Sequence, residues 1–243
     1  MSIARFFCPQ PLSPGQRIAL PEQAAHHASR VLRLKLGDAL VVFNGDGGEF
    51  EARIDALRKG AVDVLVGQFH AIERESTLRI MLAQGVSTAE KMDFTLQKAV
   101  ELGVEAIYPI LTEKGVVRLD EARAARRQLH WQAVVASACE QCGRNRVPRV
   151  APVSTLPQFL HAFPHEGPRF VLSPRAQRPL RDLAPPVAGA TFLAGPEGGL
   201  SAGEEQQAID AGFEAVRLGP RILRTETAAM AALAAAQALW GDF

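Results

Sequence analysis

The chain has 243 residues, of which 47% are hydrophobic and 22% are charged, and its formal net charge is +1. This balance is typical of a folded globular protein and excludes a disordered polyelectrolyte. No apolar run approaches the roughly 20 residues that span a bilayer, and residues 1–11 lack the apolar stretch of a signal peptide. We therefore expect a cytoplasmic protein that has no membrane partner.

Residues 1–72 are predicted to form a small β-barrel with one helix. Runs rich in β-forming residues, separated by Gly, Pro, Asp and Asn, lie at 5–8, 16–20, 39–44, 49–57 and 61–69. The cluster Asn44-Gly45-Asp46-Gly47-Gly48 between the third and fourth runs indicates a hairpin turn. One helix is predicted over about 21–34, and the charged stretch 73–76 marks the end of this domain.

Residues 76–243 are predicted to form a second domain, of the α/β class. Short buried strands are expected at 78–83, 106–111, 170–172, 191–194 and 215–218. They alternate with helices that we expect after Ser87, where Gly103 ends the helix, and over about 121–142, 201–212 and 225–239. Ser87-Thr88-Ala89-Glu90 and Ser201-Ala202-Gly203-Glu204 each predict a capping box. The alternation favours a parallel sheet with helices on both faces.

The cysteines Cys8, Cys139 and Cys142 are too few for a disulfide framework. Cys139 and Cys142 form a C-x-x-C pattern, which fits a redox pair, half of a zinc site, or two small residues on one helix face. The last interpretation is favoured. A four-thiolate zinc site needs a second such pair, which the sequence lacks, so we expect no metal.

Basic residues are concentrated locally although the net charge is small. Residues 121–150 contain six Arg and two acidic residues, and 22 of the 27 basic residues are Arg. Arg binds phosphate as a planar fork and stacks on bases, so this pattern fits RNA binding. Solvated helix faces would give the same pattern, and charge alone leaves both interpretations open.

Two loops combine residue types that suit ligand binding. Gly195-Pro196-Glu197-Gly198-Gly199 joins a predicted strand to a helix, the place where open α/β sheets bind ligands. It is neither a Walker A loop nor a G-x-G-x-x-G fingerprint, and an ordinary tight turn is the alternative. Residues 218–227 also join a strand to a helix, and Ile222 and Leu223 could wall an apolar slot for an adenine. The alternative is a helix start with Thr225 as its N-cap.

Taken together, these loops resemble the cofactor motifs of the 16S rRNA uridine-N3 methyltransferases (RsmE type) of the SPOUT superfamily. Other segments of the chain resemble that family in the same order: His26-His27 with Val31-Leu32-Arg33 and Gly37-Asp38, Lys91 through Lys98 to Val104, Glu140 to Arg144, and Arg146-Val147-Pro148. Glu113-Lys114-Gly115 departs from the family pattern, in which an Arg or Ser is expected.

The resemblance implies a fold and a cofactor. The expected fold is a knotted SPOUT methyltransferase domain, with a parallel sheet and a deep trefoil knot, preceded by a small PUA-like β-barrel that binds RNA. It also implies a homodimer that acts on 16S rRNA of the small ribosomal subunit. S-adenosyl-L-methionine (SAM) is expected to bind in three loops, which contain Leu172, Ser173, Pro174, Gly195, Pro196, Glu197, Gly198, Gly199, Leu218, Gly219, Ile222, Leu223, Arg224 and Thr225.

Methyl transfer to N3 of uridine requires loss of the N3 proton and stabilisation of charge on O2 and O4. Our candidates for this chemistry are Arg144, Arg224, Glu197 and Glu226, the two Glu as base or orienting groups. The candidates for RNA binding are Arg5, His26, His27, Arg30, Arg33, Arg144 and Arg146. Two other functions fit the same loops: ribose 2′-O-methylation of tRNA or rRNA, and ribosome assembly by an inactive RNA-binding factor.

Overall fold

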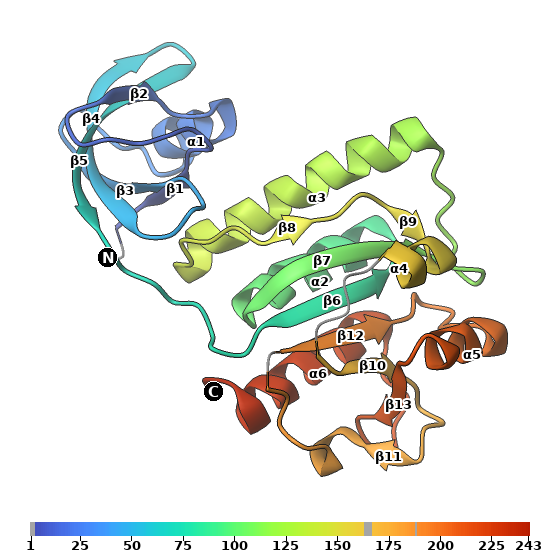
Figure 1. Cartoon of the computed structure of the whole chain (residues 1–243). Helices are drawn as coiled ribbons and strands as arrows, with labels where there is room; N and C mark the ends of the chain where they lie inside the picture. The colour runs from blue at the N-terminus through green and yellow to red at the C-terminus, as the bar shows by residue number, and fades with distance from the viewer. Residues whose placement is uncertain (1–2, 163–166, 188) are drawn as a thin grey trace. The chain divides into compact units, whose positions relative to one another are not determined.

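The computed structural model of the chain describes residues 3–162, 167–187 and 189–243. The chain forms two compact units (Figure 1). The first comprises Met1–Glu75 and Ala136–Val147, and the second comprises Ser76–Val135 and Pro148–Phe243. The boundary at Glu75 and Ser76 lies within the charged stretch 73–76. The assignment of Ala136–Val147 to the first unit differs from the uninterrupted second domain, 76–243, that we expected.

The first unit is built on a five-stranded sheet in the order β1-β3-β4-β5-β2. The strands are β1 (Arg5–Phe7), β2 (Arg17–Ala19), β3 (Ala39–Phe43), β4 (Glu49–Arg58) and β5 (Ala61–His70). All five predicted strands are confirmed, and β3 and β4 form the predicted antiparallel hairpin. Alternate residues of β5, namely Val62, Val64 and Val66, are buried in the core, as a sheet with one packed face requires.

The helix predicted over 21–34 is shorter and less regular than expected. It consists of α1 (Glu22–His26) and a π-helical turn, η1 (His27–Val31). The helix cannot continue because Arg33 adopts the left-handed conformation, with φ of 55°. Among the described residues, Arg33 is the only one other than glycine with positive φ, so the backbone is strained next to the exposed Arg30.

The second unit contains a sheet whose paired strands are all parallel, in the order β11-β13-β10-β12-β6-β7-β8, with β9 paired to β7. The strands are β6 (Ile80–Gly85), β7 (Val104–Leu111), β8 (Arg149–Val150), β9 (Ser154–Thr155), β10 (Arg169–Leu172), β11 (Arg178–Pro179), β12 (Ala190–Ala194) and β13 (Glu214–Arg217). The five predicted strands are confirmed, whereas the two-residue strands were too short to show a pattern in the sequence.

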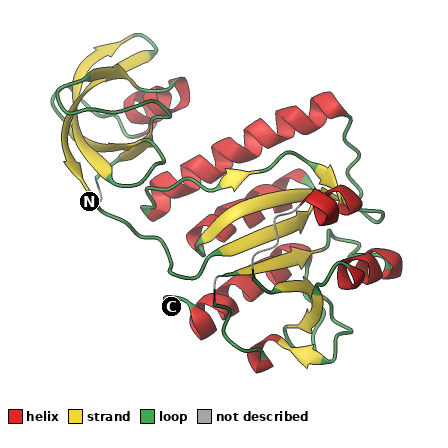
Figure 2. Cartoon of the chain, in the orientation of Figure 1, coloured by secondary structure: helices red, strands yellow, loops and turns green. Residues whose placement is uncertain are grey.

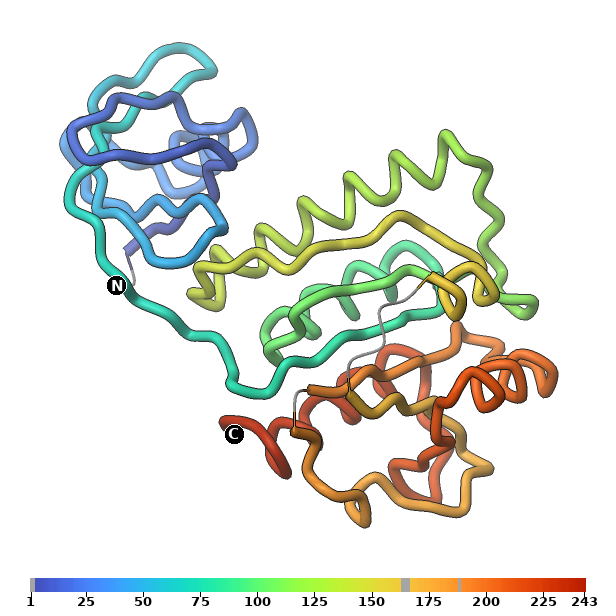
Figure 3. Tube along the Cα trace, viewed as in Figure 1, coloured from blue at the N-terminus to red at the C-terminus, as the bar shows by residue number. Residues whose placement is uncertain are grey.

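Helices cover both faces of this sheet (Figure 2). The helices α2 (Ala89–Glu101) and α6 (Thr225–Trp240) contact each other and pack on one face. The opposite face is covered by α4 (Leu156–Ala162) and α5 (Ala202–Asp210), which share a core cluster with Ala83 of β6. The remaining long helix, α3 (Glu121–Cys142), has the predicted bounds and follows β7 along the Cα trace of Figure 3. A short 3-10 helix, η2, spans Leu180–Asp182.

One of the two predicted capping boxes is confirmed and the other is wrong. At the start of α5, the Ser201 hydroxyl accepts a hydrogen bond from the Glu204 N–H at 3.1 Å, and the Glu204 carboxylate accepts one from the Ser201 N–H at 2.8 Å. At the start of α2 the N-cap residue is Thr88, and its side chain makes no capping bond. A carboxylate from another loop occupies that helix end instead, as described below.

No helix in the described part of the chain is long and apolar enough to cross a membrane. The same residues contain no group of three or more His, Cys, Asp or Glu that could hold a metal ion.

Candidate functional site

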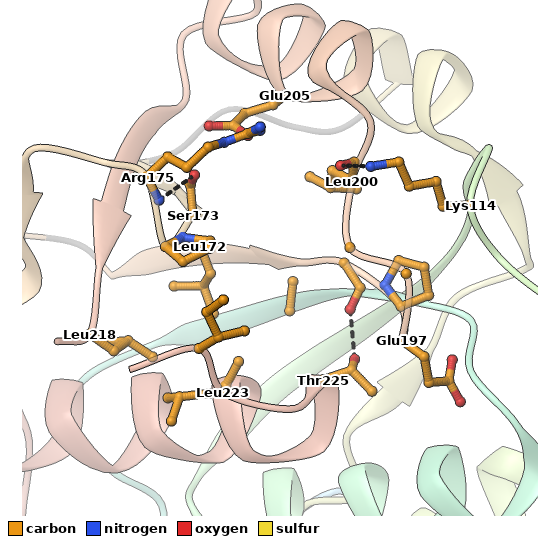
Figure 4. A pocket seen from close by; sticks show the side chains of 18 of the residues that line it. Lys114, Leu172, Ser173, Arg175, Glu197, Leu200, Glu205, Leu218, Leu223 and Thr225 are labelled. Atoms are coloured by element: carbon orange, nitrogen blue, oxygen red, sulfur yellow. Dashed lines mark hydrogen bonds and ion pairs between the residues drawn. The ribbon is translucent and has the colours of Figure 1, made fainter. Parts of the chain in front are cut away.

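A cavity of about 420 Å³ lies in the second unit at the carboxyl ends of β10, β12 and β13 (Figure 4). The loops that follow these three strands form its walls, as expected for a parallel α/β sheet. It brings together all but one of the residues predicted for the cofactor: Leu172, Ser173, Pro174, Gly195, Pro196, Glu197, Gly198, Gly199, Leu218, Gly219, Ile222, Leu223 and Thr225. Only Arg224 of the predicted set does not line the cavity.

Several residues of the lining were not predicted from the sequence. Most of them are neighbours of the predicted loops and could have been included by extending each loop by one or two positions. Lys114 is different because it comes from a fourth loop, which follows β7. Its ammonium group donates a hydrogen bond to the carbonyl oxygen of Leu200 at 3.2 Å (Figure 4). The missed residues are Lys114, Arg175, Ala194, Leu200, Glu205, Val216, Arg221 and Ala228.

Close packing explains two of the glycines in the loop after β12, residues 195–199, which we call the first cofactor loop. A Cβ atom on Gly198 would lie 2.9 Å from both the Cβ and the carbonyl oxygen of Lys114, and one on Gly195 would lie 2.8 Å from the Leu200 nitrogen. Gly199 has φ of 67°, which favours glycine. Gly198 does not adopt positive φ, so the close approach of the Lys114 loop, and not its backbone conformation, explains this glycine.

Glu197 contacts the start of α2 rather than the centre of the cavity. Its carboxylate accepts hydrogen bonds from the Thr88 N–H at 3.0 Å and from the Thr88 hydroxyl at 2.9 Å, and it lies 3.5 Å from the Lys91 ammonium group. Figure 4 shows the Glu197 side chain turned away from the cavity. Burial raises the pKa of Glu197, but the bonds from Thr88 and the charge of Lys91 outweigh it and hold that pKa below its ordinary value.

Glu204 connects the first cofactor loop to the Lys114 loop. One oxygen of its buried carboxylate accepts the capping bond from the Ser201 N–H, and the other accepts a bond from the Glu113 N–H at 2.8 Å. The same carboxylate thus fixes the start of α5 and the backbone next to Lys114. This bond places Lys114 beside the glycine loop, although nothing in the local sequence around Lys114 predicts it.

In the loop after β13, residues 218–225, which we call the second cofactor loop, Thr225 takes a role different from the N-cap that the sequence suggested. Arg224 occupies the N-cap position of α6, and Thr225 is the first helical residue. The Thr225 hydroxyl donates a hydrogen bond to the carbonyl oxygen of Gly195 at 2.6 Å, which ties the second loop to the first. Leu218 and Leu223 line the cavity nearby and supply apolar walls, as expected for a slot that accepts an adenine.

The charged groups around the cavity differ in how they are paired. Arg175 forms a 2.6 Å ion pair with Glu205, and Glu197 is held by Thr88 and Lys91. Lys114 contacts only a backbone carbonyl among its described hydrogen-bond partners. The cavity therefore offers both acidic and basic groups along an otherwise apolar wall, a combination that suits a zwitterionic ligand with an apolar ring.

In the first unit, Arg5 belongs to a buried polar network. Its guanidinium group donates to Glu49 at 2.6 Å and to the side-chain oxygen of Asn145 at 2.6 Å, and it lies 5.1 Å from the centre of the Phe43 ring. Burial raises the pKa of Glu49, but hydrogen bonds from Arg5 and Asn145 outweigh it and lower that pKa below its ordinary value. The guanidinium group that we expected to bind RNA phosphate is therefore engaged inside the unit.

Arg144 is also engaged within the first unit. Its side chain is only 6% exposed and forms a double hydrogen-bonded ion pair with Glu75, one bond of which is 3.0 Å long. Arg144 thus lies in the first unit, whereas Arg224, Glu197 and Glu226 lie in the second. The structure does not bring Arg144 together with the other three predicted catalytic residues within one unit.

The remaining residues predicted to bind RNA are on the surface of the first unit. His26, His27, Arg30 and Arg33 are exposed and belong to α1, η1 and the residues just after them. Arg146 is exposed as well, and its guanidinium group lies 3.5 Å from the Glu73 carboxylate. His27 makes an edge-on ring contact with Phe6, so its ring also packs on the barrel core.

The three cysteines are free. Burial raises the pKa of Cys8 and of Cys139 to about 12 in each case, so neither thiol forms a reactive thiolate near neutral pH. The C-x-x-C pattern therefore fits two small residues of a packed helix better than a redox pair.

Comparison with known proteins agrees with this geometry. Residues 74–237 match a family model described as an RNA methyltransferase domain, and residues 20–67 match one described as an RNA methyltransferase PUA domain. Ribosomal RNA small subunit methyltransferase E of Buchnera aphidicola (subsp. Schizaphis graminum) is 35% identical over 99% of this chain and 98% of its own length. The corresponding Bacillus subtilis protein is 29% identical over 93% and 91%.

Two solved structures have nearly the same fold. A ribosomal RNA small subunit methyltransferase E from Neisseria gonorrhoeae, bound to S-adenosyl methionine, has a TM-score of 0.91 and 44% identity, with 100% of both chains covered. A methyltransferase from Legionella pneumophila in complex with SAM has a TM-score of 0.95 and 38% identity, again with 100% of both chains covered. Fold and cavity together define an RNA methyltransferase with an N-terminal PUA domain. The chain belongs to the ribosomal RNA small subunit methyltransferase E family.

Proposed function

We propose that this protein uses SAM to methylate N3 of one uridine in 16S rRNA of the small ribosomal subunit. The observation that carries the proposal is the cavity at the carboxyl ends of β10, β12 and β13, which gathers thirteen of the fourteen residues expected to bind SAM. The family membership of the whole chain supports the same reaction.

The cavity fits SAM in size and in chemistry. Its volume of about 420 Å³ lies in the range of small-molecule sites, roughly 300–1,000 Å³. Leu218 and Leu223 suit the adenine ring, while Glu205 and Arg175 provide opposite charges for the amino-acid end. When bound, SAM would supply an electrophilic methyl group.

We assign the protein's part in the reaction to residues at the start of α6. Arg224 is exposed there, and we propose that it stabilises negative charge on O2 or O4 of the uridine as N3 loses its proton. Glu226, in the first turn of α6, is the better candidate for a base or orienting group, since Glu197 has a lowered pKa and is turned toward Thr88. Arg144 is better explained as a structural partner of Glu75.

RNA binding is proposed for the exposed basic residues of the first unit, which are His26, His27, Arg30, Arg33 and Arg146. Their side chains can contact phosphates without competing with strong internal ion pairs, unlike those of Arg5 and Arg144.

We further propose that the second unit carries the trefoil knot of SPOUT methyltransferases and that the protein acts as a cytoplasmic homodimer. The knot test is mechanical: a knotted chain pulled from its two ends retains a tightened knot and ends shorter than its full contour length.

A methylation assay with product analysis tests the proposal. Purified protein, labelled SAM and small ribosomal subunits that lack the modification are incubated, and the rRNA is digested to nucleosides. Label in N3-methyluridine supports the proposed reaction. Label in a 2′-O-methylated nucleoside would show the alternative enzyme, and RNA binding without SAM binding would show an inactive assembly factor.

A further inference from the structure

We propose that Gln84 is a positioning residue that holds the two cofactor loops together and so sets the affinity for SAM. The inference rests on the proposed function, because it takes the cavity to be the SAM site. Gln84 does not line the cavity and would act through Gly195 and Thr225, which do.

Gln84 is placed for this role by the register of the sheet. It is the fifth residue of β6, and it pairs with Ala194, the last residue of β12 before the glycine loop. Successive residues of β6 point to opposite faces, and Ala83 belongs to the cluster under α4 and α5, so Gln84 points to the face covered by α2 and α6. Its side chain is completely buried there.

The amide of Gln84 joins three segments of the chain. Its nitrogen donates to the Thr225 hydroxyl at 3.0 Å and, over a longer 3.4 Å, to the carbonyl oxygen of Gly195. The same nitrogen lies 3.1 Å from the carbonyl oxygen of the next residue, Gly85, which is a third acceptor. The Thr225 hydroxyl in turn donates to the same Gly195 oxygen at 2.6 Å. The end of β6, the first cofactor loop and the start of α6 thus share one set of hydrogen bonds.

Gln84 stabilises the fold less than an apolar residue of the same length would. This indicates that its role is to position the cofactor loops. Its side-chain oxygen is buried and has no hydrogen-bond partner among the described residues. A buried polar atom without a partner lowers stability, whereas an apolar side chain of the same length would carry no such penalty. The favourable contribution of Gln84 is therefore concentrated in its nitrogen, and two of the three acceptors of this nitrogen belong to Gly195 and Thr225, which line the cavity.

Loss of this amide should weaken SAM binding without slowing the chemical step. Without it, the loops after β12 and β13 retain one direct bond and sample wider arrangements, so SAM must order them when it binds. We expect the KM for SAM to rise about tenfold, the change that a loss of 1.4 kcal/mol produces. The value of kcat at saturating SAM should stay within about threefold, because no group that touches the reacting atoms is removed.

The experiment compares Gln84→Met with Gln237→Met in the full-length protein. Met has nearly the length and volume of Gln. Gln237 is a matched control, since it is 1% exposed, donates to the Leu102 carbonyl at 3.0 Å and accepts from the Ser76 hydroxyl at 2.8 Å, all away from the cofactor loops. The measurements are thermal unfolding, calorimetric titration with S-adenosylhomocysteine, and amide hydrogen exchange of residues 195–199 and 225–228 without ligand.

The proposal predicts faster exchange in both loops and weaker binding in Gln84→Met, with neither change in Gln237→Met. Unchanged exchange and affinity in Gln84→Met would overturn it, and so would equal losses in the two variants, which would indicate general destabilisation. The exchange measurement needs no ligand, so it decides the role of Gln84 even if the wild-type protein binds no S-adenosylhomocysteine, a result that would refute the proposed function instead. If Gln84→Met does not fold, the same exchange measurement is made on Thr225→Val and Thr225→Ser. Val removes the hydroxyl that bonds to Gln84 and Gly195, whereas Ser keeps it.

Discussion

The Glu197 carboxylate accepts hydrogen bonds from both the N–H and the hydroxyl group of Thr88, at 3.0 and 2.9 Å. Thr88 is the N-cap residue of α2, and a negative charge at a helix N-terminus is favoured by the helix dipole. The first cofactor loop therefore supplies the cap that the local sequence of α2 was expected to provide. One side chain thus links the loop after β12 to the start of α2.

The low pKa of Glu197 predicts a pH-dependent contribution to stability. Because the pKa is lower in the folded protein than the ordinary value of 4.5, the contribution is fully present above pH 4.5 and disappears as the pH falls through the folded-state pKa. Glu197→Gln should therefore be less stable than the wild type at pH 7 and approach it in acid. Unfolding by denaturant at several pH values measures this, and a difference that stays constant down to the acid limit would contradict it.

Gly198→Val should abolish SAM binding while the first unit stays folded. The added side chain would collide with the Cβ and the backbone oxygen of Lys114, so either the glycine loop or the Lys114 loop must move. Gly203→Ala is the control, since the atom nearest to a new Cβ there is the Ser201 oxygen at 3.8 Å. Calorimetric titration measures binding, and an unaltered Kd in Gly198→Val would show that the cofactor lies elsewhere.

Arg144→Ala should destabilise the first unit by about 2–3 kcal/mol, because it leaves the Glu75 carboxylate without its main partner. Arg146→Ala, which removes a more exposed pair with Glu73, should cost about 0.5 kcal/mol or less. Arg224→Ala should instead spare stability and lower kcat. Denaturant unfolding and turnover assays separate these effects. A stable Arg144→Ala protein with greatly reduced turnover would return Arg144 to the catalytic residues.

Glu140 carries the opposite pH dependence to Glu197. Burial raises the pKa of its carboxyl group above the ordinary 4.5, despite a 2.8 Å bond from the Phe7 N–H. The folded protein therefore binds more protons than the unfolded chain, and stability is lost as the pH rises from 4.5 through the raised pKa. Glu140→Gln keeps an acceptor for Phe7 without the charge, so we expect a higher Tm at pH 7 and a smaller gain at pH 4. A lower Tm at pH 7 would refute this explanation.

Much of the fold could be predicted because its signals are local. The buried strands of the second unit, the capping box at Ser201 and the bounds of α3 all follow from periodicity and from residues within one turn of each element. The cofactor loops could be found for the same reason, since the end of a parallel strand followed by glycine and a helix start marks a binding edge. These loops gained their identity from the family resemblance, which spacing alone does not provide.

The features that the sequence did not reveal depend on contacts between residues that are distant in the sequence. Lys114 reaches the cavity through a bond between Glu113 and Glu204, which are 91 positions apart. The ion pair of Arg144 was not foreseen, because its partner, Glu75, is 69 positions away. The capping box at Ser87 failed because Glu197, 109 positions from Thr88, competes for the same helix end. A single sequence contains no signal for such pairs.

The assignment of Ala136–Val147 to the first unit affects how this protein can be divided. A fragment that begins at Ser76 contains Asn145 and Glu140 but lacks Arg5, Glu49 and Phe7, to which they bond. A fragment that ends at Glu75 lacks the matching groups on the other side. Neither fragment therefore contains the complete polar network of the first unit. Two separate stretches of the gene encode this network, so a single recombination event that exchanged residues 1–75 between relatives would replace only one part of it.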